Sequence, residues 1–149
     1  MTNLHKELVK ILREEKDLLT DLYKIVSEER DLIVGLKSSE LERILTVKEA
    51  TIMKLSLWEK EREKLLSEHE LKGKPLSFIL SINPEDNDST EVLELRELYE
   101  SMKTLLESIS EIQKINEQLI DHSINYVGTA LRFLESFGIF PKQSLSKEA

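Results

Sequence analysis

Apolar residues recur at every seventh position along much of the chain, and this spacing predicts long helices that pack as coiled coils. Near the start, one such file is apolar at every member: Leu4, Ile11, Leu18, Ile25 and Leu32. Two further files beside it are also largely apolar, which is more than a two-stranded contact requires. The first helix is therefore expected to pack against two other helices.

Glycine and proline residues interrupt this pattern in two segments, 35–39 and 73–89, and the second segment contains two of the three prolines. The uninterrupted intervals between them predict three helices, and the apolar run after the second helix is expected to form a strap. The expected elements are helices at about 3–36, 39–72 and 89–137, the strap at 73–88 and a tail at 138–149.

Two capping boxes support the starts of the second and third helices. Ser39 is followed three residues later by Glu42, and Asp88 stands in the same relation to Glu91. We therefore predict a single all-α domain over residues 1–149. Its architecture is expected to be an elongated antiparallel three-helix coiled-coil bundle with an overhanging C-terminal helix.

Two carboxylates, Glu15 and Glu29, interrupt an otherwise apolar file of the first helix. When the leucines on either side of the first turn are placed opposite each other, Glu29 pairs with Lys48 and Glu15 pairs with Arg62. One interpretation is that these are buried structural ion pairs, which fix the alignment of the two helices at some cost in stability. The alternative is that all four are solvated residues at the edges of the interface, and the sequence favours neither.

The three helices differ in length, and the difference predicts an unsupported end. At about 1.5 Å per residue, the first two helices span roughly 50 Å and the third roughly 70 Å. The third helix should therefore project past the first turn from about residue 124 onward. Because this projecting part is rich in apolar residues, it is expected to dock a partner, to form a homodimer, or to fold back near Gly128.

Composition and charge exclude several classes of function. The formal charge of −8 argues against a nucleic-acid partner and against tight binding to an anionic membrane. The absence of cysteine excludes disulfides, thiolate metal sites and cysteine nucleophiles. No run of residues resembles a secretory signal or approaches the length of a bilayer span, so a cytoplasmic protein without membrane insertion is expected.

No catalytic, cofactor-binding or metal-binding site is expected. The three histidines, His5, His69 and His122, are isolated, and none follows a glutamate by three residues as a di-iron bundle requires. The four glycines form no phosphate-binding loop. Trp58 belongs to a helical file of mostly apolar residues and is interpreted as a core residue. The protein is therefore not expected to be an enzyme or to need a cofactor.

Four short motifs point to a known family. They are an acidic residue before the first turn, a Lys-Glu pair and a Glu-x-x-Arg in the second helix, and in the third an Asn-x-x-Asn pattern whose first position is Gln in this chain. In this sequence they are Glu29, Lys48-Glu49, Glu59 to Arg62, and Gln113 to Asn116. Together with the helical pattern from about Leu4 to Leu134, they resemble the FlgN-type flagellar export chaperones of bacteria.

The resemblance implies a cytoplasmic chaperone without catalytic activity. Its partners would be the C-terminal segments of hook-filament junction proteins, which the C-terminal helix holds and delivers to the flagellar type III export gate. The partner-binding residues implied by position are Asn116, Leu119, Ile120, Tyr126, Val127, Phe133 and Leu134. The alternative function is a structural coiled-coil adaptor that self-associates, for example as a homodimer, and binds no cargo.

Overall fold

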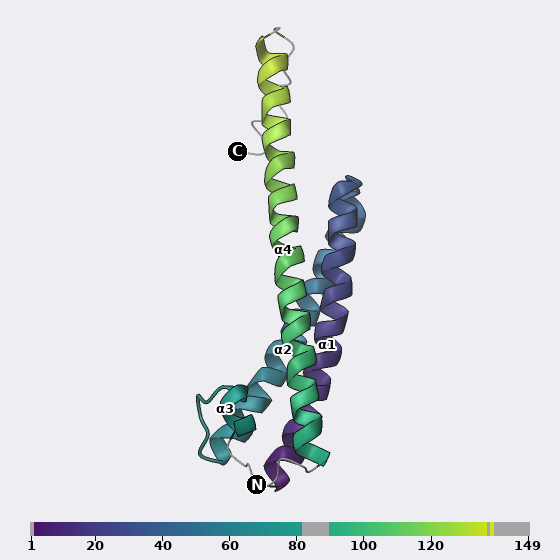
Figure 1. The fold of residues 1–149 in the computed structure, drawn as a ribbon. Coiled ribbons are helices and arrows are strands. Elements are labelled where there is room, and N and C mark those ends of the chain that lie inside the picture. Colours follow the sequence, from purple (N-terminus) through teal and green to yellow (C-terminus); the bar gives the residue numbers. More distant parts are fainter. Residues whose placement is uncertain (1, 82–89, 137, 139–149) are drawn as a thin grey trace.

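The computed structural model describes residues 2–81, 90–136 and 138 of the chain. The part of the chain that it describes is helical, with three long helices and one short one, and it contains no strand. Each long helix is antiparallel to the one before it, so the third long helix runs parallel to the first (Figure 1). The all-helical fold class is therefore confirmed. The helices are α1 (Thr2–Val34), α2 (Ser38–Glu68), α3 (Leu76–Ser81) and α4 (Thr90–Ser136).

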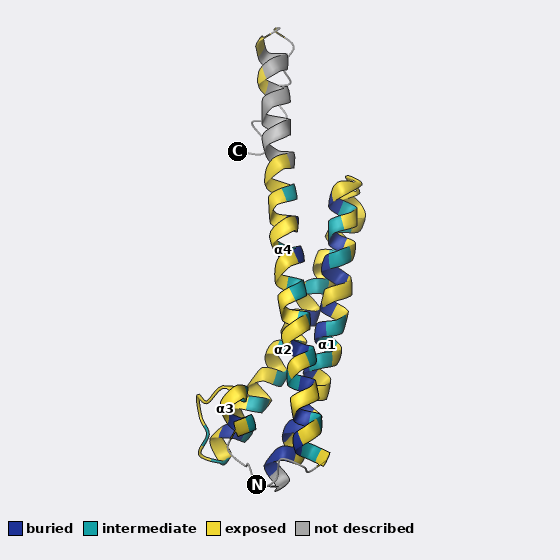
Figure 2. Cartoon of the chain, viewed as in Figure 1, coloured by how far each residue is buried: buried dark blue, intermediate teal, exposed yellow. Residues whose placement is uncertain are grey.

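Helix α1 is the centre of the structure, because it packs extensively against both α2 and α4. This arrangement follows from the apolar files of α1, which cover more than one face of the helix. Buried residues accordingly follow α1 along most of its length, whereas α2 is largely exposed (Figure 2). The largest fully buried apolar side chains are Leu4, Leu8, Leu12, Val26, Ile79 and Leu95.

Helices α1 and α2 both end in a Schellman motif whose left-handed residue is not glycine. After α1, Leu36 has a φ of 54°, and the N–H of Lys37 donates to the carbonyl of Leu32 at 3.0 Å. After α2, Glu70 has a φ of 60°, and the N–H of Leu71 donates to the carbonyl of Leu66 at 2.8 Å. These turns end the helices at Val34 and Glu68, before the expected ends at 36 and 72.

The capping box expected for the second helix is not formed. Helix α2 begins at Ser38, and Lys37 occupies the N-cap position without a side-chain cap hydrogen bond. The Schellman turn explains this difference, because it already fixes Lys37, whose carbonyl accepts the first helical hydrogen bond from Leu41 at 2.9 Å. The box expected for the third helix depends on Asp88, which lies outside the described residues.

The segment expected to be a strap contains the short helix α3. Its Ile79 is buried in the core cluster that also includes Leu66 and Leu95, so α3 closes the end of the bundle where α2 finishes. Residues 82–89 lie outside the described residues.

Helix α4 extends well beyond the turn between α1 and α2 (Figure 1). Ile120 marks the level of that turn, because it lines a hollow together with Leu36, Lys37 and Leu41. The helix continues for a further sixteen residues, to Ser136. We call the part of α4 from residue 121 to residue 136 the overhang.

The left-handed residue at the end of α2 leads to a test of stability. We expect Glu70→Gly to raise the free energy of unfolding by about 0.5–1 kcal/mol, because glycine adopts a positive φ without the steric cost of a Cβ atom. Urea denaturation measures the change. The matched control is Glu68→Gly within the last turn of α2, which should lower the free energy of unfolding; an equal fall in both variants would contradict the assignment.

Candidate functional site

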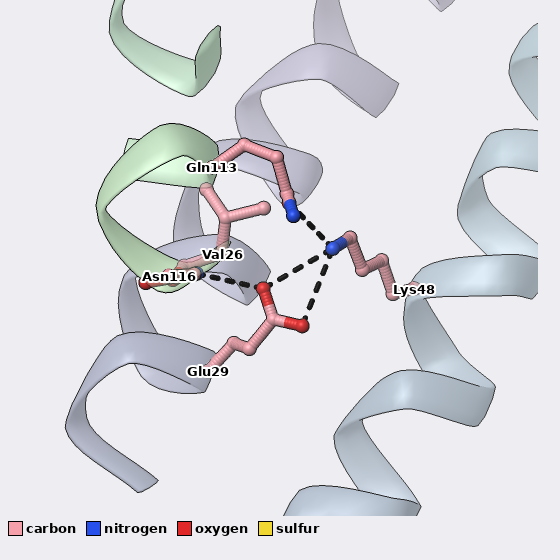
Figure 3. A network of polar contacts seen from close by, with 5 residues as sticks. All are labelled: Val26, Glu29, Lys48, Gln113 and Asn116. Carbon is pink, nitrogen blue, oxygen red and sulfur yellow. Dashed lines mark hydrogen bonds and ion pairs between the residues drawn. The ribbon is translucent and has the colours of Figure 1, made fainter. Parts of the chain in front are cut away.

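A polar layer lies inside the otherwise apolar interface of the three long helices (Figure 3). The Nζ of Lys48 on α2 donates to both carboxylate oxygens of Glu29 on α1, at 3.1 and 3.2 Å, and to Oε1 of Gln113 on α4 at 2.5 Å. Nδ2 of Asn116, also on α4, donates to Oε1 of Glu29 at 2.7 Å and to the backbone carbonyl of Val26 at 3.0 Å. One carboxylate therefore connects α1 to both of its neighbours.

The burial of its residues makes this layer important for the stability of the fold. Glu29 is 2% exposed and Asn116 is 0% exposed. A carboxylate at such a place needs charge-assisted hydrogen bonds, because an unpaired buried charge costs several kcal/mol. Oδ1 of Asn116 has no hydrogen-bond partner in the described part of the chain, a defect that costs about 1–3 kcal/mol. The side-chain amide of Asn116 therefore donates to Glu29 through Nδ2, although its Oδ1 is left without a donor.

A second polar layer lies closer to the α3 end of the bundle. Nη1 of Arg62 on α2 donates to both oxygens of Glu15 on α1, at 2.9 and 3.1 Å. Burial raises the pKa of Glu15 above its ordinary value of 4.5, the positive charge of Arg62 opposes this rise, and the nearby carboxylate of Glu59 adds to it. The structure therefore brings together both pairs that the sequence register predicts, and it buries both carboxylates.

The two layers alternate with apolar contacts along the α1–α2 interface. Leu22 and Leu55 lie in one apolar cluster between the layers, and Leu36 and Leu41 line one hollow beyond them. A shift of one heptad in either direction would place Glu29 opposite a leucine, Leu41 or Leu55, where its charge has no partner. We propose that this alternation fixes the register of α1 and α2, as the sequence pattern predicts.

The residues expected to bind a partner fall into three groups. Asn116 is buried in the polar layer and offers no accessible surface in this structure. Leu119 is half-buried and Ile120 is 39% exposed, at the base of the overhang. The remaining four lie on the helical part of the overhang, but their side chains lie outside the described residues: Tyr126, Val127, Phe133 and Leu134.

Sequence reasoning did not identify the structural role of the α4 residues in the polar layer. Gln113 was recognised only as part of a motif, and Asn116 was assigned to partner binding. The signal was present, because Asn116 interrupts the heptad file of Leu95, Met102 and Ile109 in the same way that Glu29 interrupts its own file on α1. Matching the two interruptions required the parallel alignment of α1 and α4, which no short turn connects.

The described residues contain no group of three or more His, Cys, Asp or Glu side chains that could hold a metal ion. Within the same residues, no helix is both long enough and apolar enough to cross a membrane.

Comparison with known proteins gives one match. A family model described as FlgN protein matches residues 1–136, which include all four helices. No curated protein and no solved structure matches the chain.

The polar layer at Glu29 leads to a prediction for stability. We expect Lys48→Met to lower the free energy of unfolding by about 3 kcal/mol, because it leaves the carboxylate of Glu29 buried with the Asn116 amide as its remaining donor. The double variant Glu29→Met/Lys48→Met should lose less, since it buries no charge. Urea denaturation compares these variants with Lys54→Met, an exposed control on α2. A Lys48→Met effect no larger than that of the control would remove the proposed role of the layer.

The raised pKa of Glu15 predicts a dependence on pH. The folded protein binds a proton at Glu15 more readily than the unfolded chain does, so this residue lowers the free energy of unfolding as pH rises from about 4.5 through its folded pKa. The stability of the parent relative to Glu15→Gln should therefore fall as pH rises from about 4 to about 7. Leu19→Ala, a neighbouring change without charge, should show a difference that is independent of pH. A flat Glu15→Gln difference would contradict the prediction.

Proposed function

This chain belongs to the FlgN family of flagellar export chaperones, which are not enzymes, and from this membership we propose a specific mode of action. The protein binds the C-terminal segments of hook-filament junction proteins through its C-terminal helix. It holds them in the cytoplasm and delivers them to the flagellar type III export gate.

The overhang of α4 is the observation that supports this mode most directly. Helix α4 passes the α1–α2 turn at Ile120 and continues to Ser136, beyond the reach of α1 and α2 (Figure 1). A helix end that projects from a bundle is ordinarily polar, whereas this one has an apolar sequence that includes Tyr126, Val127, Phe133 and Leu134. An apolar helix face of this kind suits an amphipathic partner segment.

The base of the overhang extends the proposed surface. Leu36, which is 80% exposed, and Ile120 line a mostly apolar hollow of about 220 Å³, together with Leu32 and Leu41. This hollow could bind an apolar side chain of a cargo segment that lies along the overhang. Leu119 and Ile120 lie at the same level of α4. Asn116 contributes indirectly, because its hydrogen bond to Glu29 holds α4 against α1 just before the overhang.

Capture of this kind suits an export chaperone. A cargo segment that is disordered in isolation loses conformational entropy when it folds on the overhang, and this loss lowers the net affinity. The complex then blocks premature assembly of the cargo while it remains weak enough to release the cargo at the gate. The export gate is the second proposed partner, and no residue is assigned to it.

The proposal is tested by a double substitution in the overhang. We expect Phe133→Ser/Leu134→Ser to weaken binding of a junction protein's C-terminal segment by at least about tenfold, because it removes two apolar anchors. Isothermal titration calorimetry measures the affinity, and thermal melting should change little, because the helix extends past the turn between α1 and α2 (Figure 1).

The matched control replaces Met53 and Leu57 by serine, since both are exposed on α2 and more than half accessible. This variant should bind the segment as the parent does. A size measurement on the parent, alone and with the segment, separates the proposal from its alternative. A one-to-one complex supports the chaperone, whereas a dimer that ignores the segment would establish the self-associating adaptor.

A further inference from the structure

A cleft lies where α2, α3 and α4 meet, at the end of the bundle away from the overhang. Its volume is about 430 Å³, and it adjoins a second hollow that shares Arg62, Leu66, Lys74 and Pro75 with it. The cleft exists because α2 packs against α1 while forming no extensive interface with α4. Helix α3 bridges part of the distance, since it contacts α4.

The lining of the cleft is apolar at its base. Leu66 and Met102 are buried there, and both belong to the core cluster of this end of the bundle. Leu106 lines the same cleft but is 52% exposed, and Tyr99 is half-buried beside it. The cleft therefore presents an accessible leucine above a closed apolar base, which suits an apolar side chain of a ligand.

The rim of the cleft has the opposite charge to the chain as a whole. The protein has a formal charge of −8, yet the two adjoining hollows are lined by six cationic side chains and by only two carboxylates, Glu63 and Glu107. The cationic side chains are Lys60, Arg62, Lys64, Lys72, Lys74 and Lys103.

Most of these cations are available to a ligand. Arg62 is paired with Glu15, whereas the five lysines are exposed and form no ion pair with any residue in the described ranges. Lys74 lies over the ring of Phe78, with its Nζ 4.9 Å from the ring centroid, so its position is held by α3. An anionic ligand would thus meet positive charge on a surface that is otherwise acidic, which favours its approach to this site over others.

We propose that this cleft binds an acidic peptide segment of a partner protein, with an apolar residue seated on Leu106 and Met102 and carboxylates beside Lys74 and Lys103. The apolar base distinguishes such a segment from a polyphosphate or a nucleic acid, which would gain nothing from Leu106 and would be repelled by the remaining surface. This site is separate from the overhang and extends the proposed function to a second protein contact.

The test uses the full chain and a fluorescein-labelled synthetic peptide in which glutamate pairs alternate with leucine pairs. Fluorescence anisotropy should show saturable binding that weakens as salt is raised, and Lys74→Glu/Lys103→Glu should weaken it by at least about tenfold. Lys24→Glu/Lys54→Glu changes the net charge equally at exposed sites on α1 and α2, outside the cleft lining, and should bind nearly as the parent does. Methyl NMR signals of Met102 and Leu106 should shift on titration, while that of Met53 should not.

Several results would overturn the proposal. They are an absence of binding by the parent, equal weakening in the two charge variants, and equal affinity for a peptide with serine in place of leucine. Binding of phosphatidylglycerol vesicles in preference to the peptide would assign the cleft to a membrane instead. The acidic residues Glu85 and Asp86 of this same chain are the other candidate for the cleft. They would be its ligand if Glu85→Gln/Asp86→Asn raises the affinity for the peptide more than Asp17→Asn/Asp21→Asn on α1 does. Because cargo binding at the overhang is measured separately, failure here leaves the proposed function standing.

Discussion

The carboxylate of Glu29 is the group on which the relative positions of the three long helices depend. It is buried, so its charge must be matched by donors, and these come from Lys48 on α2 and Asn116 on α4. Sliding either neighbour along α1 by one helical turn, about 5.4 Å, would move its donor out of hydrogen-bond range. Apolar contacts tolerate a shift of one heptad, about 10.5 Å, far better, because it places one leucine where another leucine had been. We therefore propose that the hydrophobic files supply most of the packing energy and that the polar layer selects the alignment.

The central position of α1 explains the uneven burial of the molecule. Because α1 provides both major interfaces, the faces of α2 and α4 that point away from it remain uncovered by the described residues. Met53 and Leu57 on α2, and Leu106 on α4, are all more than half exposed. A closed three-helix bundle would have buried many such residues in a third interface. Here the accessible apolar surface is available for contacts with other molecules.

Much of the fold could be predicted from the sequence, because heptad files and breakers are local signals. The pairing of Glu29 with Lys48, and of Glu15 with Arg62, followed from a single assumption about the first turn. The helix ends were less accessible, because Leu36 and Glu70 adopt the left-handed conformation that usually signals glycine. The contribution of Asn116 to the bundle was missed because it depends on contact between α1 and α4, which are far apart in sequence. The side chains of the overhang remain a prediction from sequence alone.

The length of α4 determines whether two partners can bind at the same time. The cleft lies at the level of Leu106 and the overhang begins after Ile120, so about 20 Å of helix separates the two surfaces at 1.5 Å per residue. Short segments bound at two surfaces this far apart do not obstruct each other sterically. If both proposed surfaces bind their partners, the protein holds the two partners at once in a ternary assembly, and they do not compete for one site.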